Sequence, residues 1–256
     1  MPLGLGTNLS RAGMVTPGII TDNLVLKHNY AAGAVVPVSD GAVYFDGSAS
    51  RATAGSTETI TGDITITCWA MGTFSPTLGA YSYLVSFGPI ADDGDFIQMR
   101  TGTGANYFRL DYGTDADGAD GNLRYDNHYV QYEWIHWAAT LDVSSSTPQV
   151  VYKNGVILAS DSTAVGQPEA EFTNRTWTLG SYNASDNHQW QGYMCNVGVW
   201  NSVLTQAEIK SVMFSDYSNA KSTAGNPLHW WACDEGTGST LTDQGSRGLN
   251  LALTGT

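Results

Sequence analysis

The stretch WQGYMCNVGVWNSVLTQAEIKSVM, residues Trp190–Met213, changes its pattern half-way along. In its first half, apolar side chains recur at every second position, which is typical of a β-strand. In its second half, Thr205 is followed three residues later by Glu208, the capping-box pattern that begins a helix. We therefore predict one short capping helix near residues 205–213, directly after a strand.

From Gly41 onward the chain predicts many short antiparallel strands. The runs DITITCWAMGTF, SYLVSFG, NYFRLDYG and EWIHWAATLDV alternate apolar and other side chains or end at a glycine. The run QVVYKNGVILAS places Asn154-Gly155 between two apolar segments, a hairpin signal because a type I′ turn needs positive φ at both central positions. Short strands with regular turn signals indicate a two-sheet sandwich or a barrel.

Composition narrows the classes of partner. The 256 residues include 24 acidic and 11 basic side chains, for a net charge of −13. An acidic chain without a basic stripe argues against nucleic acid and against anionic membranes as partners. No stretch approaches the ~20 apolar residues of a membrane span, and the N-terminus lacks a signal-peptide pattern. We expect no nucleic-acid partner, no membrane partner and no visible export route.

Three cysteines leave at least one thiol unpaired. Cys68 and Cys195 each share a strand face with small apolar residues, so we predict that both are buried free thiols. A disulfide or a metal site is the alternative, although no CxxC or HxxxH spacing supports zinc.

Residues 1–40 differ from the rest of the chain. They hold isolated apolar patches, Pro17, Pro37 and several glycines, and only IITDNLVLKHNY has strand-like content. We predict an extended N-terminal arm, which either packs along its own sandwich or docks onto a sister subunit or partner.

The order of YFDG, ITITCWA, EWIHWAATLD, VYKNG, WTLG and WQGYMCNVGVWNSVLTQAEI resembles the laminin-G-like, concanavalin-A-like jelly-roll family over roughly residues 41–215. The resemblance implies an all-β, two-sheet antiparallel jelly-roll sandwich capped by the short helix. The tail HWWACDEGTGSTLTDQG resembles the family's usual first strand. It implies that residues 41–256 form one circularly permuted domain, with the tail strand beside the strand of AVYFDG.

Catalytic signals are weak in this chain. Glycanases of the wider superfamily carry Glu-x-Asp-x-x-Glu, which does not occur here. Only Glu169 and Glu171 could share a strand face, and a retaining pair needs carboxyl groups ~5 Å apart. We expect a protein that is not an enzyme, and a glycoside hydrolase is the less favoured alternative.

No cofactor is required by the sequence, but the resemblance implies a structural Ca²⁺ at Asp46 and Asp243. The family's usual FDGxDDY is FDGSASR here, so its later carboxylates are missing. A separate acidic run, DYGTDADGADGNLRYD, has a density of carboxylates close to that of a calcium loop. It fails the EF-hand register, so we interpret it as a solvated loop.

The loop SYNASDNHQW combines aromatic and polar side chains between two strands, as glycan-binding loops do. An ordinary loop of the same composition is the alternative. The candidate glycan-binding residues are Tyr182, Asn183, Asp186, Asn187, His188 and Trp190.

The arm GMVTPGIITDNLVLKHNY also resembles segments that precede such modules in structural proteins of tailed bacteriophages. The resemblance implies a homo-oligomeric virion accessory protein, a capsid decoration or fibre-like subunit. Residues 1–40 would anchor it to a phage capsid or another virion protein, and the jelly roll would bind a host-surface glycan. The alternative is an exported glycan-binding, lectin-like module at a bacterial cell surface.

Overall fold

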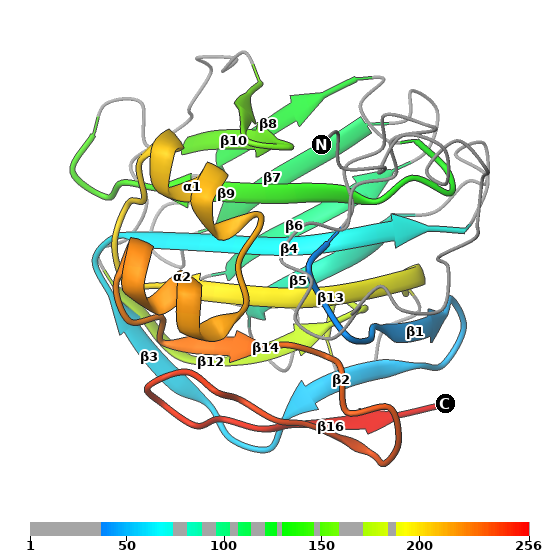
Figure 1. The fold of residues 1–256 in the computed structure, drawn as a ribbon. Coiled ribbons are helices and arrows are strands. Elements are labelled where there is room, and N and C mark those ends of the chain that lie inside the picture. The colour runs from blue at the N-terminus through cyan, green and yellow to red at the C-terminus, as the bar shows by residue number, and fades with distance from the viewer. Residues whose placement is uncertain are drawn as a thin grey trace, which may run out of the picture.

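The computed structural model describes residues 37–73, 81–88, 96–102, 107–113, 121–126, 130–145, 149–158, 171–183 and 188–255. Two antiparallel β-sheets pack face to face in this part of the chain (Figure 1). The predicted all-β two-sheet sandwich is therefore confirmed. The predicted N-terminal arm lies almost entirely outside the described residues.

The first sheet has seven described strands. Its order is β1 (Val43–Asp46), β13 (Gln191–Trp200), β4 (Ile64–Gly72), β9 (Ile135–Leu141), β10 (Gln149–Lys153) and β11 (Val156–Ile157), and β14 (His229–Trp231) also pairs with β13. Asn154 and Gly155, the predicted hairpin turn between β10 and β11, both have positive φ.

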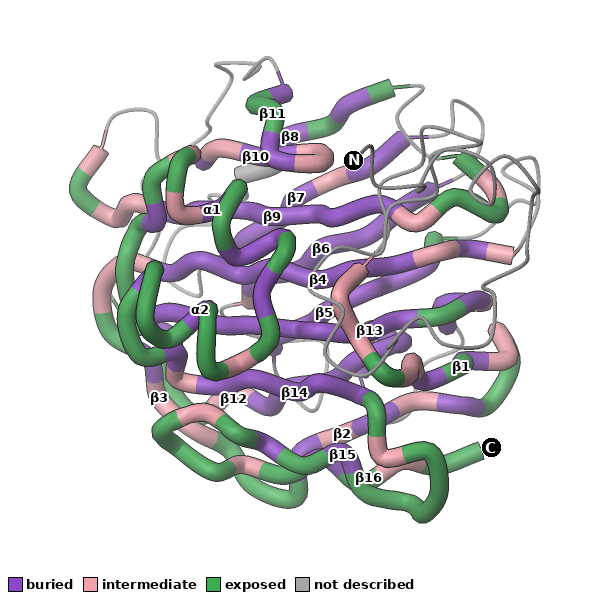
Figure 2. The backbone as a smooth tube through the Cα atoms, viewed as in Figure 1, coloured by how far each residue is buried: buried purple, intermediate pink, exposed green. Residues whose placement is uncertain are grey.

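The second sheet has nine described strands. Its order is β15 (Thr240–Leu241), β16 (Leu251–Thr254), β2 (Arg51–Ala54), β12 (Glu171–Leu179), β5 (Ser82–Gly88), β6 (Phe96–Gly102), β7 (Tyr107–Gly113) and β8 (Gly121–Tyr125), and β3 (Glu58–Thr61) also pairs with β12. Figure 2 colours most of the central strands of both sheets as buried. Alternate side chains along a strand point to one face, and those between the sheets form the main core.

The predicted capping helix is present as α1 (Gln206–Val212). Thr205 is its N-cap, and Thr205 and Glu208 complete the expected capping box. A second helix, α2 (Tyr217–Ala224), was not predicted. Its sequence is rich in Ser, Asn and Thr, which favour turns, and its buried face consists only of Ala220 and Ala224.

The two helices cover the outer face of the seven-stranded sheet (Figure 1). Trp230 and Trp231 are neighbours on β14 and point to opposite faces. Trp231 packs in the main core, whereas Trp230 belongs to a second apolar cluster with Trp200 and Ile209 of α1. This covering removes from water an apolar face that would otherwise be exposed. Among the described residues, no helix is long and apolar enough to span a membrane.

Both predicted thiols are confirmed. Cys68, Cys195 and also Cys233 are free and buried. Burial raises the pKa of the Cys195 thiol to about 12, so this cysteine is a small core side chain rather than a reactive nucleophile.

The C-terminal tail joins the sandwich differently from the expectation. We expected the tail strand beside the strand of AVYFDG, and this is wrong: β14 pairs with β13, in line with β1. Val43 lies opposite Met194, and Trp231 lies opposite Val197 on the same edge. The sequence indicates the order of the strands along the chain, but it cannot show that two short strands, β1 and β14, pair with the same edge of β13. Further along the tail, β16 pairs with β2.

A buried histidine, His229, links the C-terminal tail to β3. His229 on β14 contacts Asp243 through Nδ1 (2.7 Å) and Glu58 of β3 through Nε2 (2.8 Å). Asp243 also accepts from the backbone N–H groups of Trp230 and Leu249. Both ring nitrogens can donate only when the imidazole is protonated, so the geometry is that of an imidazolium between two carboxylates.

The surroundings shift the pKa values of His229, Glu58 and Asp243 in the directions that favour a charged imidazolium and two charged carboxylates. Burial alone would lower the pKa of His229, but hydrogen bonds from its ring to Asp243 and Glu58 outweigh burial and raise it above 6.5. Burial would likewise raise the carboxyl pKa values, yet the hydrogen bonds with His229 hold both below their ordinary ranges. The group is therefore most stable as one cation between two anions.

This network predicts a bell-shaped dependence of folding stability on pH. The raised pKa of His229 gives stability that is complete below its unfolded value of ~6.5 and is lost as pH rises through the folded value. The lowered pKa values of Glu58 and Asp243 give stability that is complete above ~4.5 and is lost as pH falls through their folded values. We expect a maximum between these limits in urea titrations at successive pH values.

The variant His229→Gln is expected to lose the alkaline decline between pH 6.5 and 9, and His136→Gln is the matched control. His136 is also buried, but burial lowers its pKa to about 3, so it stays neutral over this range. An alkaline decline that persists in His229→Gln would contradict the assignment.

Candidate functional site

A row of long polar side chains crosses one end of the nine-stranded sheet. Tyr83 on β5 lies opposite Arg100 on β6, Arg100 opposite Arg109 on β7, and Arg109 opposite Arg124 on β8. Directly opposed residues stand on the same face of a sheet. Their neighbours Met99 and Leu110 point into the core, so this row stands on the outer face.

Aromatic rings surround the first arginine of this row. The guanidinium carbon of Arg100 lies 4.3 Å from the ring centroid of Tyr81 and 5.6 Å from that of Tyr83. The Tyr83 ring contacts Tyr182 at 5.1 Å and His188 at 6.1 Å between centroids. We call Tyr81, Tyr83, Arg100, Tyr182 and His188 the tyrosine–arginine cluster.

Backbone pairing holds this cluster together. Tyr83 forms a β-bridge with Gln189, and the N–H of Tyr83 donates to the carbonyl of His188. The N–H of Trp190 donates to the carbonyl of Gly180 at 2.8 Å, which closes the described parts of the 180–190 segment. Residues near 182 and 188 are thereby placed over the end of β5.

The predicted glycan-binding residues are only partly brought together. Tyr182 and His188 join the cluster, whereas the side chain of Asn183 is mostly buried. Trp190 is 1% exposed and packs in the core, so it presents no surface to a ligand. Asp186 and Asn187 lie outside the described residues.

Sequence reasoning missed Tyr81, Tyr83 and Arg100. The run SYLVSFG predicts a strand and marks no binding residue, and a register irregularity between Tyr83 and Val85 changes which side chains face outward. The arginines carried a usable signal, because Arg100, Arg109 and Arg124 each alternate with core residues in three successive strands.

Buried polar groups extend the outer face beside the cluster. Ser86 and Gln98 lie opposite each other, and Thr176 stands on the next strand, β12. Ser86 Oγ, Gln98 Nε2 and Thr176 Oγ1 are buried and have no hydrogen-bond partner among the described residues. Such groups normally bind water, and because Ser86, Gln98 and Thr176 are only 1%, 3% and 8% exposed, they present no surface to a ligand.

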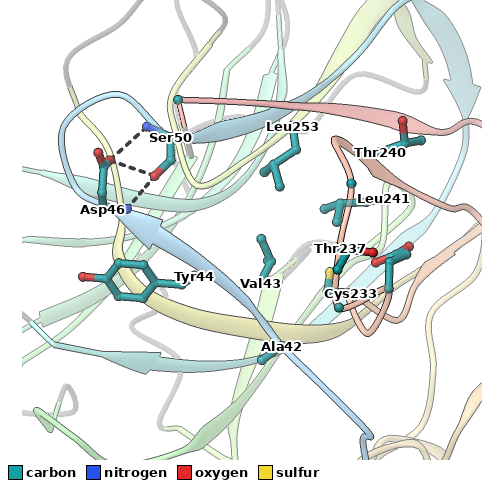
Figure 3. A pocket seen from close by; sticks show the side chains of 14 residues that line it. Ala42, Val43, Tyr44, Asp46, Ser50, Cys233, Thr237, Thr240, Leu241 and Leu253 are labelled. Carbon is teal, nitrogen blue, oxygen red and sulfur yellow. Dashed lines mark hydrogen bonds between the residues drawn. The ribbon is translucent and has the colours of Figure 1, made fainter.

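A second hollow lies between β1 and the C-terminal tail (Figure 3). Its volume is about 480 Å³. Val43, Leu241 and Leu253 line one part, and Asp46 and Ser50 lie together at its edge. Glu235, Thr237 and Thr240 add polar groups from the tail.

The Asp46 carboxylate caps its own loop. Its Oδ1 accepts from the backbone N–H groups of Ser48, Ala49 and Ser50, each at 2.9 Å, and Oδ2 accepts from the Ser48 hydroxyl at 2.7 Å. These bonds, that from Ala49 first, hold the pKa of Asp46 far below its usual range. The carboxylate thus already has protein donors that satisfy it.

The structure does not bring Asp46 and Asp243 together. Asp46 lies opposite Gln191, whereas the bridge partner of Asp243, Trp231, lies opposite Val197. Six residues along β13 correspond to ~20 Å at about 3.3 Å per residue. Within the described ranges, no group of three or more His, Cys, Asp or Glu residues is arranged to hold a metal ion. Structural calcium therefore stays a prediction without a shared site for these two residues.

The other acidic candidates are also placed. Glu171 is exposed at the start of β12, and Glu169 lies outside the described residues. In the acidic run, Asp126 forms an ion pair with Arg124 at 2.7 Å, and Asp111 forms ion pairs with Arg100 and Arg109. The remaining three aspartates, Asp115, Asp117 and Asp120, lie outside the described residues.

Two antiparallel sheets packed face to face define the class of jelly-roll sandwiches. The chain belongs to the Laminin_G_3 family of the concanavalin A-like lectin/glucanases superfamily, whose model matches residues 45–210. No curated protein matches the sequence.

Solved structures share the fold at low sequence identity. A heptameric SAP-like pentraxin from Limulus polyphemus is 14% identical with a TM-score of 0.52, and the match covers 66% of this chain and 80% of the pentraxin. A protein from Bacteroides ovatus, proposed to bind carbohydrate, is 15% identical with a TM-score of 0.55. That match covers 81% of this chain and 59% of the Bacteroides chain.

The loop capped by Asp46 makes a prediction about stability. The substitution Asp46→Asn removes the charge that three backbone N–H groups bind, so we expect a loss of about 1–3 kcal/mol in the free energy of unfolding. Equilibrium urea unfolding at pH 7 measures this loss. The same titration with EDTA and with millimolar Ca²⁺ tests the predicted ion: a Ca²⁺-dependent gain that Asp46→Asn abolishes would place calcium at this loop.

Proposed function

We propose that this protein is a lectin-like carbohydrate-binding module that binds a glycan at the tyrosine–arginine cluster without cleaving it. The observation that carries the proposal is the pairing of exposed aromatic rings with a row of arginines on one sheet face. Tyr81 is 45% exposed, and Tyr182 is half-buried beside Tyr83. Arg109 and Arg124 continue the same face, and their side chains are partly exposed.

A sugar has an apolar ring face and hydroxyl groups, which match the aromatic rings and the polar side chains of this sheet face. The C–H face of a pyranose ring is apolar and packs against an aromatic ring, which gains burial of area without a charged partner. The hydroxyl groups of the sugar can donate and accept, so they can accept hydrogen bonds from the guanidinium groups of the row. A face with stacking rings and partly exposed guanidinium groups therefore favours a glycan over a purely apolar ligand.

The absence of cleavage is part of the proposal. Glycoside hydrolysis needs two carboxyl groups that face one bond. Among the described residues of the cluster and its row, the carboxylates are Asp111, which ion-pairs with Arg100 and Arg109, and Asp126, which ion-pairs with Arg124. These carboxylates are committed to arginines, which favours binding over acid–base chemistry.

The comparisons support the carbohydrate-binding hypothesis through the family's description and the Bacteroides protein. The virion hypothesis depends on residues 1–40, of which 1–36 lie outside the described residues. Neither the family description nor the solved structures reported above name a virion protein. A place in the virion, a capsid partner and homo-oligomers stay predictions.

Substitution of single rings tests the site. Tyr81→Ala and Tyr182→Ala are expected to weaken glycan binding by about tenfold each, because a stacking ring and its buried area are lost. Binding partners would first be found on a glycan array, and affinities then measured by isothermal titration calorimetry.

Tyr44→Ala is the matched control. The exposed fraction of Tyr44, 41%, is similar to that of Tyr81, 45%. Tyr44, however, lies on β1 at the edge of the hollow beside the tail. Normal affinity in Tyr44→Ala with weakened affinity in Tyr81→Ala would support the cluster. The opposite pattern would move the glycan to the hollow of Figure 3.

The non-enzymatic part is tested separately. Purified protein is expected to release no reducing sugar from the polysaccharides that contain its array hits. Turnover that disappears in Glu171→Gln would overturn this part and restore the glycoside hydrolase alternative.

A further inference from the structure

The row that continues the cluster places three arginines side by side. Arg100, Arg109 and Arg124 lie directly opposite one another on β6, β7 and β8. Like charges in directly opposed positions destabilise a sheet. The chain has only 11 basic residues and a net charge of −13, so a row of three is far from its average composition.

Two carboxylates neutralise this row incompletely. Asp111 pairs with Nε of both Arg100 and Arg109, and Asp126 pairs with Nε of Arg124. Three guanidinium groups against two carboxylates leave one net positive charge among the described residues of the row. Asp111 stands two residues beyond Arg109 on the same face of β7, so it lies to one side of the row.

The outer two arginines keep donors for a ligand. The side chains of Arg109 and Arg124 are 26% and 46% exposed. Each uses Nε for its carboxylate, and in the described part of the chain their terminal amino groups have no hydrogen-bond partner. Guanidinium groups with free donors bind carboxylates and sulfates through paired charge-assisted hydrogen bonds.

The outermost arginine is held in place by a ring. The guanidinium carbon of Arg124 lies 4.2 Å from the ring centroid of Tyr107, whose hydroxyl also contacts Arg100. Tyr107 lies opposite Gly102, and a Cβ added at Gly102 would come within 2.2 Å of that ring. Glycine at this position therefore lets the ring lie across β6, where it orients Arg124 toward its neighbours in the row.

We propose that Arg109 and Arg124 bind the acidic group of a negatively charged glycan, a carboxylate or a sulfate ester, whose neighbouring sugar stacks on the tyrosine–arginine cluster. This inference rests on the proposed function and specifies its ligand class. The acidic group supplies the negative charge that the row lacks, and it would bind where the polar face passes from tyrosines to arginines.

The test is a glycan array that holds uronate-, sialate- and sulfate-bearing oligosaccharides beside their uncharged counterparts, followed by calorimetry on the hits. The expected result is preferential binding of acidic members over their neutral partners. Titration of the uronate and sulfate hits separates the two acidic groups. Affinity should fall as NaCl rises from 0.15 to 1 M, because exposed ion pairs are screened.

Arg124→Gln is the main variant, since its exposed side chain can be changed without opening the core. We expect a loss of roughly tenfold or more in affinity for the acidic hit and no change for an uncharged glycan. Arg124→Lys keeps the charge but loses the planar fork, so its affinity should be intermediate. Arg109→Gln should weaken the same ligand.

Arg51→Gln is the matched control, because Arg51 stands on the outer face of the same sheet, four strand positions from Arg109. It makes the same change in net charge. Equal losses in Arg51→Gln and Arg124→Gln, or binding of neutral glycans only, would overturn the acidic-ligand inference and leave glycan binding intact. Binding of no glycan on the array would overturn both proposals.

Discussion

A buried imidazolium joins the two sheets of this sandwich. His229 belongs to β14 in the seven-stranded sheet, and Glu58 belongs to β3, which pairs within the nine-stranded sheet. Trp177 of β12 and Arg247 of the tail also donate to Glu58. Buried ion pairs cost several kcal/mol in lost hydration, so such a network persists only where every charge is satisfied. Here each carboxylate accepts several hydrogen bonds, and both imidazole nitrogens donate.

The position of His229 follows from how the sheet is completed. An unpaired edge of β13 would present free N–H and C=O groups and would invite aggregation. Two short strands, β1 and β14, cover consecutive parts of that edge, and the chain entering β1 passes close against the chain leaving β14. A Cβ at Gly41 would come 3.0 Å from the Cα of Asp234. The edge is thus closed only when the segment entering β1 and the segment leaving β14 meet, and the imidazolium fixes β14 in that arrangement.

The sequence predicted what local pattern can specify. Alternation predicted the core strands, Asn154-Gly155 predicted its hairpin, and Thr205 with Glu208 predicted α1. The sequence could not predict the shared edge of β13 or the network of Glu58 and His229. Both depend on contacts between distant segments, and Glu58 and His229 are 171 positions apart. The candidate site was predicted in part: the loop supplied Tyr182 and His188, but cross-strand register brought in Tyr83 of β5 and the arginines. Trp190 shows the limit of composition, since its ring belongs to the core.

The arginine row also determines how an acidic ligand could be recognised by an acidic protein. At physiological ionic strength, charges separated by more than ~8 Å are largely screened. The net charge of −13 therefore repels a distant anion only weakly, and it gives the anion no electrostatic steering. Recognition must then come from short-range contacts: two guanidinium groups whose terminal amino groups have no partner among the described residues, and rings that pack against a sugar face. Such a site distinguishes ligands by the position of the charge on the sugar. A mobile counter-ion can neutralise the arginines, but it cannot also pack against the aromatic rings.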